Sequence, residues 1–78
     1  MIVKNRLLAL MGEKQAKTNQ PITQAVVARE TGLTRQAINK WAKGEVQEFK
    51  ADTIAKLCRY FECQVGDLLY IEDAATAQ

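Results

Sequence analysis

The stretch Thr23-Gln-Ala-Val-Val-Ala-Arg-Glu-Thr-Gly-Leu-Thr-Arg-Gln-Ala-Ile-Asn-Lys-Trp-Ala-Lys-Gly44 predicts two short helices joined by a tight turn. Thr23 stands where its side-chain oxygen can cap the first helix, and Thr34 stands in the same position before the second. Gly32 lies between them and can adopt the left-handed conformation that ends a helix without a Cβ penalty. The stretch therefore predicts a helix-turn-helix motif over residues 23–44, with its second helix at about residues 35–43.

The two helices share an apolar side, and the second also has a polar side. Ala28 is the small residue that allows the helices to approach, and Leu33, Ile38 and Trp41 complete the apolar seam. The outward face of the second helix consists of side chains able to hydrogen-bond base edges or phosphates, namely Arg35, Gln36, Asn39, Lys40 and Lys43. A helix with such a face fits the major groove of DNA.

At these residues the segment resembles the helix-turn-helix of the lambda-repressor/Cro-like (Xre-type) DNA-binding family. Its small residue, turn glycine and apolar seam fall where that family places them. The family's further helices match Asp52–Phe61 and Gly66–Leu69, so the resemblance covers most of the chain. It implies an all-α fold of five short helices and the binding of double-stranded DNA.

The resemblance also implies which side chains contact bases. Thr34, Arg35 and Gln36 correspond to the helix end that enters the major groove, and Asn39 and Lys40 correspond to positions one turn later. Arg35 can bind guanine and Gln36 can bind adenine through paired hydrogen bonds. We therefore expect base contacts from Arg35, Gln36, Asn39 and Lys40.

A second set of side chains is expected at the DNA phosphates. The family commonly places a phosphate-binding Gln at the position of Gln24, where the free amides of a helix N-terminus already favour an anion. Lys43 lies at a corner that the family also uses for phosphate contact. Lys50 stays exposed if Phe49 anchors the following loop to the core. Thr34 is interpreted first as a cap and second as a phosphate contact.

The net charge of +2 is unevenly distributed. Residues 1–23 carry a net charge of +3, residues 24–50 of +2 and residues 51–78 of −3. Because attraction to a polyanion depends on the local field, this acidic C-terminal part is compatible with DNA binding by the basic part. Glu45 and Glu48 lie close to the expected DNA backbone in the sequence, so we expect them to point away from it.

The two ends of the chain contain further apolar segments. The β-branched pair Ile2-Val3 favours an extended start, before a helix predicted from Lys4 or Asn5 to about Gln15. Leu68–Ile71 is the other apolar stretch outside the helices, so the termini are predicted to pair as a minimal antiparallel sheet, within one chain or across a dimer.

A second copy of the chain is the expected partner of the C-terminal segment. Leu69, Tyr70 and Ile71 would otherwise expose apolar surface, which is stabilised by burial. We therefore expect a homodimer with these three residues at its interface. Residues 1–72 are predicted to form one DNA-binding domain, and the polar tail 73–78 is predicted to be frayed.

Composition argues against several other classes of protein. The chain has no His and no Gly-rich phosphate loop, so we expect neither an enzyme nor a bound cofactor. Two cysteines, Cys58 and Cys63, are too few for a zinc site. Cys58 is expected in the protein core, on the inner face of a helix that Asp52 caps. A redox or intersubunit role of Cys63 stays open. Since no signal peptide or membrane span is apparent, we expect a cytoplasmic protein. No small-molecule site is evident in the sequence.

Three functions remain in contention after these exclusions. The favoured one is a homodimeric, sequence-specific transcriptional regulator on a palindromic operator, with half-sites about 34 Å apart. A second is the DNA-binding antitoxin of a toxin–antitoxin pair, which would need an additional toxin-binding segment. The third is a protein-interaction module that has kept the fold without DNA affinity, which Glu45 and Glu48 keep open.

Overall fold

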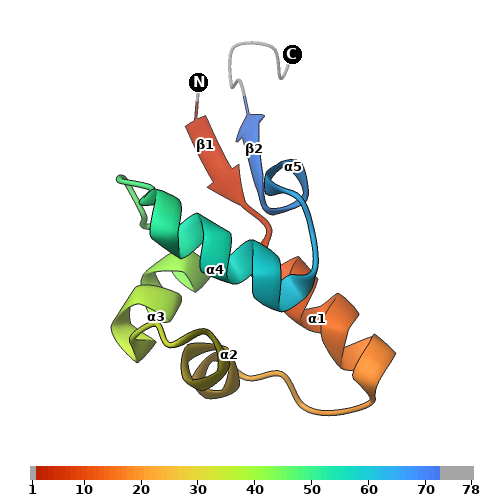
Figure 1. Cartoon of the computed structure of the whole chain (residues 1–78). Coiled ribbons are helices and arrows are strands. Elements are labelled where there is room, and N and C mark those ends of the chain that lie inside the picture. The colour runs from red at the N-terminus through yellow and green to blue at the C-terminus, as the bar shows by residue number, and fades with distance from the viewer. Residues whose placement is uncertain (1, 73–78) are drawn as a thin grey trace.

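The computed structural model describes residues 2–72, so the predicted tail at 73–78 lies outside the described residues. The elements follow in the order β1 (Ile2–Asn5), α1 (Leu7–Thr18), α2 (Gln24–Thr31), α3 (Arg35–Lys43), α4 (Ala51–Phe61), α5 (Val65–Leu68) and β2 (Leu69–Glu72). Figure 1 shows the helices gathered in one body, with the two strands side by side at one end of it. Five helices and a small antiparallel sheet confirm the predicted fold class.

The helix-turn-helix has the predicted boundaries because its local signals are all used. The Val26 amide donates to Thr23 Oγ1 at 3.2 Å, and the Ala37 amide donates to Thr34 Oγ1 at 3.0 Å. Gly32 ends α2 with φ +77°, in the left-handed region that glycine adopts without steric cost. Helices α2 and α3 are thereby held in the relation that the sequence predicts.

The core lies between the helices and is closed by residues from both ends of the chain. Its buried side chains are Leu7, Leu10, Met11, Ile22, Val27, Ala28, Ile38, Trp41, Leu57 and Leu68. Trp41 and Phe49 meet edge to face, with ring centroids 5.5 Å apart, as the predicted anchoring of the loop after α3 requires. On α4, Ile54, Leu57 and Cys58 face this core, which agrees with the expected place of Cys58.

Three predicted helix starts differ from the structure, and that of α5 does so by one residue, since it begins at Val65 rather than Gly66. Helix α1 begins at Leu7 rather than at residue 4 or 5, because Ile2–Asn5 pair as a strand and the Leu7 amide donates to Asn5 Oδ1 at 3.0 Å. It also continues past Gln15 and ends at Thr18. Helix α4 begins at Ala51, so Asp52 is not its cap. Asp52 lies in the first turn, where its negative charge interacts favourably with the positive end of the helix dipole. Its carboxylate also pairs with Lys56 at 3.1 Å.

The predicted terminal sheet forms within one chain. Strands β1 and β2 are antiparallel, with Ile2 opposite Glu72 and Asn5 opposite Leu69. The Arg6 amide continues the ladder by donating to the Leu68 carbonyl at 2.8 Å. Because two-stranded ribbons are marginal in isolation, the sheet depends on the helices beneath it, where Leu69 is half-buried against the core.

Candidate nucleic-acid interface

Helix α3 turns one side into the core and presents the other to solvent. Ile38 is fully buried and Trp41 is 4% exposed, which fixes the rotation of the helix about its axis. All the residues predicted to contact bases, namely Arg35, Gln36, Asn39 and Lys40, are exposed. These residues therefore form the solvent-exposed face of α3 that the sequence predicts.

Of the residues predicted at phosphates, Thr34 and Lys50 line one hollow together with Gln36 and Lys40 of this face. Thr34 precedes α3, and Lys43 and Lys50 are exposed at the end of α3 and at the position before α4. Gln24 is half-buried at the first position of α2, and Thr34 Oγ1 is engaged as a cap. Among residues 2–72, no ion pair occupies Arg35, Lys40, Lys43 or Lys50. These cations are thus available for an external anion.

The acidic residues after α3 lie nearer to the predicted contacts than expected. Glu48 lines the same hollow, of about 300 Å³, as Gln36, Lys40 and Lys50. Glu45 lines a neighbouring hollow together with Lys40 and Lys50. A carboxylate at this place lowers the local positive potential of the surface.

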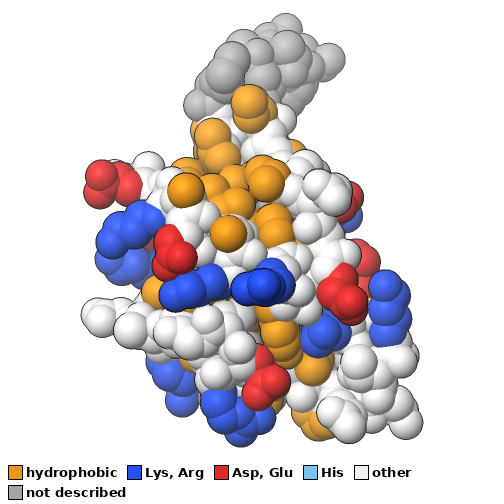
Figure 2. Space-filling model, in the orientation of Figure 1, with side chains coloured by type: hydrophobic (Ala, Val, Ile, Leu, Met, Phe, Trp, Pro, Cys, Tyr) orange, Lys and Arg blue, Asp and Glu red, His pale blue; other side chains and the backbone are white. Residues whose placement is uncertain are grey.

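Charged and apolar side chains divide the visible surface. Figure 2 shows Lys and Arg side chains, interspersed with Asp and Glu, across the middle and lower part of the molecule, where α4 and, below it, α2 and α3 lie in Figure 1. Apolar side chains gather in the upper part, toward the terminal strands. The face of α3 and the sheet are therefore chemically different surfaces of the same domain.

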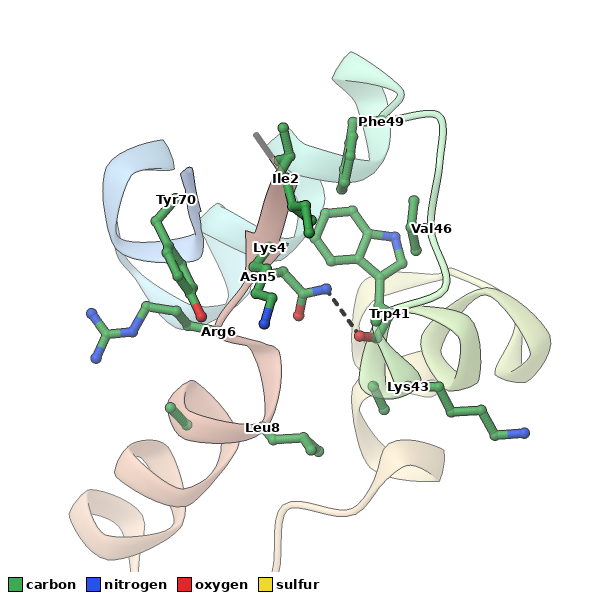
Figure 3. A pocket seen from close by; sticks show the side chains of 14 residues that line it. Ile2, Lys4, Asn5, Arg6, Leu8, Trp41, Lys43, Val46, Phe49 and Tyr70 are labelled. Carbon is green, nitrogen blue, oxygen red and sulfur yellow. Dashed lines mark hydrogen bonds between the residues drawn. The ribbon is translucent and has the colours of Figure 1, made fainter. Parts of the chain in front are cut away.

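Asn5 joins the terminal sheet to the end of α3, a role that the sequence did not reveal. Its Nδ2 donates to the Trp41 carbonyl at 3.0 Å, and its Oδ1 accepts from the Leu7 amide at 3.0 Å (Figure 3). The hydrogen bond to Trp41 crosses 36 positions of sequence. Only the folded chain brings these groups together, and the bond fixes where α3 ends relative to β1.

Replacing Asn5 by Asp should separate the two functions of this side chain. Aspartate keeps the acceptor for the Leu7 amide but loses the donor to the Trp41 carbonyl and faces that oxygen with negative charge. We expect a loss of about 1–3 kcal/mol in the free energy of unfolding, because one hydrogen bond is lost and a carboxylate is held against the Trp41 carbonyl, which keeps its bond from the Gly44 amide. Urea unfolding followed by circular dichroism measures this loss. Equal stability of wild type and Asn5→Asp would show that the contact contributes nothing.

The two cysteines are structural side chains at the end of α4. Both are free thiols and are partly buried. Burial, followed by the neighbouring Cys58 thiol, raises the pKa of Cys63 to about 11. Since the thiolate is the reactive form, this raised pKa lowers the thiolate fraction of Cys63 near neutral pH. The side chains of residues 2–72 form no cluster of three or more potential metal ligands.

The described helices are short, and α1 is the longest with 12 residues. A membrane-spanning helix needs roughly 20 apolar residues, and no helix within residues 2–72 meets the requirement.

Comparisons with known proteins agree with this geometry. A crystal structure from Bacteroides fragilis, described as that of "a putative DNA-binding protein", superposes with a TM-score of 0.70 at 20% sequence identity. The match covers 88% of this chain and 100% of that one, and at this identity it establishes a shared fold. No curated protein matches the sequence significantly. The model of the Cro/C1-type HTH DNA-binding domain matches residues 6–74, which include the motif and all five helices. The chain, with its capped α2 and α3 and the exposed polar face of α3, therefore belongs to the Cro/C1-type helix-turn-helix DNA-binding family.

Proposed function

We propose that this protein is a sequence-specific transcriptional regulator that binds the major groove of a palindromic operator as a homodimer. The observation that carries the proposal is the face of α3, where Arg35, Gln36 and Asn39 are exposed while Ile38 is fully buried. Arginine and the amide side chains are the residue types that read guanine and adenine through paired hydrogen bonds. Lys40 lies one turn further along the same face and contacts a neighbouring base.

Phosphate contacts around this face would set the register of α3 on the duplex. Lys43 and Lys50 supply exposed cations, and the N-terminus of α2 adds free amides beside Gln24. Thr34 contributes its hydroxyl hydrogen, because the oxygen already accepts from the Ala37 amide. These contacts position the protein, whereas the side chains of α3 provide the base preference.

Selection of bound duplexes from a random DNA pool, at roughly physiological salt, tests the regulator directly. Weak electrostatic binding is suppressed under this condition, so only directed base contacts enrich a sequence. We expect a two-fold symmetric consensus with half-sites about one helical turn, or 34 Å, apart. Failure to enrich any sequence would contradict the proposal and favour a protein-interaction module.

The dimer is proposed to form through the C-terminal strand. Ile71 is 62% exposed and Tyr70 is 43% exposed, which leaves apolar surface on β2 that a second copy would remove from water. Leu69 is half-buried against the core of its own chain, so its share in the interface would be smaller. For both copies of α3 to contact one duplex, a two-fold axis at β2 has to place them about 34 Å apart.

Replacing Ile71 by Asp should weaken this dimer by about ten-fold or more, because an apolar contact is lost and a charge is buried in its place. Sedimentation over a range of concentrations measures the dissociation constant. Leu8→Asp is the control, since Leu8 is similarly exposed at 57% but lies on α1. A wild-type protein that sediments as a monomer at micromolar concentration would refute the dimer without affecting the assignment of α3.

A further inference from the structure

A hollow of about 530 Å³ lies between β1 and the segment that ends α3 and leads to α4. In Figure 3, β1 runs between Tyr70 of β2 on one side and Trp41 and Phe49 on the other. We call this hollow the β1 groove. Its apolar lining includes Ile2, Leu8, Trp41, Val46, Phe49 and Tyr70. The volume is within the range of ligand sites, about 300–1,000 Å³.

The free edge of β1 opens toward this groove. The Arg6 amide bonds the Leu68 carbonyl, and the register places Lys4 opposite Tyr70 and Val3 opposite Ile71. Because hydrogen-bonded and non-bonded pairs alternate in an antiparallel ladder, Lys4 bonds to β2 whereas the amide and carbonyl of Val3 point away from it. Figures 1 and 3 both place β2 on one side of β1 and the α3–α4 connection on the other. The groove thus presents an unpaired strand edge.

All the charged side chains that line the groove are basic. Lys4, Arg6 and Lys43 contribute to its lining, and no Asp or Glu does so. Lys4 is paired with Glu72, but within residues 2–72 neither Arg6 nor Lys43 takes part in an ion pair. The apolar wall is also accessible, since Ile2 is 50% exposed and Leu8 is 57% exposed. A ligand complementary to this groove carries both aliphatic groups and negative charge.

We propose that the β1 groove binds an extended segment of a partner protein in which carboxylate and aliphatic side chains alternate. The segment adds to β1 as a third strand, with main-chain hydrogen bonds to Val3. Its aliphatic side chains pack against the exposed Ile2 and Leu8 and the half-buried Phe49, and its carboxylates pair with Arg6 and Lys43. This site is separate from the outward face of α3 and does not depend on DNA binding, although Lys43 borders both surfaces.

The test is a titration of the full chain with the peptide acetyl-Val-Glu-Val-Glu-Val-Glu-amide. Trp41 is the single tryptophan and lines the groove, so its fluorescence reports occupancy. Amide resonances of Val3 and Asn5 locate the site by NMR. We expect saturable changes in both readouts, and roughly ten-fold weaker binding of the matched Val-Lys peptide, because like charges oppose each other at an interface. Absence of saturation up to about 1 mM peptide, or equal binding of the two peptides, would overturn the proposal.

A pair of proline variants tests the strand edge. Val3→Pro removes an amide that points into the groove, whereas Ile71→Pro removes one from the opposite edge of the same sheet. Only Val3→Pro should abolish peptide binding, and equal loss in both variants would overturn strand addition.

If circular dichroism shows that the proline substitution unfolds the sheet, a charge variant tests the groove instead. Arg6→Gln should weaken peptide binding by about two- to five-fold, the range of an exposed ion pair. Lys17→Gln is the matched control on the last turn of α1, away from the groove lining, and should leave binding unchanged. Equal effects of the two substitutions would contradict a role for Arg6.

Discussion

Replacing Ile38 by Ala is expected to lower the free energy of unfolding by about 2–5 kcal/mol, the usual cost of deleting a large buried aliphatic side chain. Ile38 is fully buried on the inner side of α3, where it holds that helix against the core. Domains of this kind have only about 5–15 kcal/mol of total stability. The melting temperature should therefore fall by roughly 4–8 °C for each kcal/mol lost, as measured by calorimetry or circular dichroism.

The neighbouring position provides the control for this substitution. Asn39 lies on the same helix but is exposed, so Asn39→Ala should change the free energy of unfolding by no more than about 0.5 kcal/mol. A similar effect of both substitutions would mean that α3 does not pack on the core as described. Their difference isolates the contribution of burial from that of helix propensity.

The substitution Arg35→Ala is expected to reduce affinity for the selected operator by about 5- to 150-fold, the equivalent of 1–3 kcal/mol for one lost paired base contact. Arg35 is the first residue of α3 and is exposed. Affinity for random DNA should change much less, because base contacts contribute little there. Fluorescence anisotropy with the operator and with a scrambled duplex measures both affinities. Equal losses on the two duplexes would refute the assignment of Arg35 as a base contact.

Lys50→Ala is the matched comparison for a phosphate contact. Lys50 is exposed before α4, in the hollow that also contains Gln36 and Lys40. Its loss should weaken binding to operator and random DNA alike and reduce the salt slope of the affinity by about one. A selective loss on the operator would place Lys50 among the base contacts instead.

Helix boundaries were predicted well where the signals were local. Thr23, Gly32 and Thr34 act on amides and carbonyls within four positions of themselves, so the motif could be derived without knowledge of the rest of the fold. The start of α4 was predicted wrongly for a related reason. Asp52 can stabilise a helix either as a cap or inside the first turn, and the sequence contains no local feature that separates these two positions.

The side chains around the outward face of α3 were predictable only in part. Periodicity places Arg35, Gln36 and Asn39 opposite Ile38 and Trp41, and their exposure confirms this division. The position of Glu48 beside Gln36 and Lys40 was not predicted, because it depends on the path of the loop after α3. That path is set by the edge-to-face contact of Phe49 with Trp41.

By itself, the sequence determined the helix-turn-helix, its caps and which face of α3 is polar, since these follow from hydrogen bonds and periodicities that span only a few residues. Tertiary structure alone decided where α1 begins, how Asn5 ties β1 to Trp41, and that β1 keeps one edge free beside a basic, apolar groove. Each of these depends on segments far apart in the chain. Such contacts form only when burial of the common core brings the segments together, and no local pattern encodes their geometry.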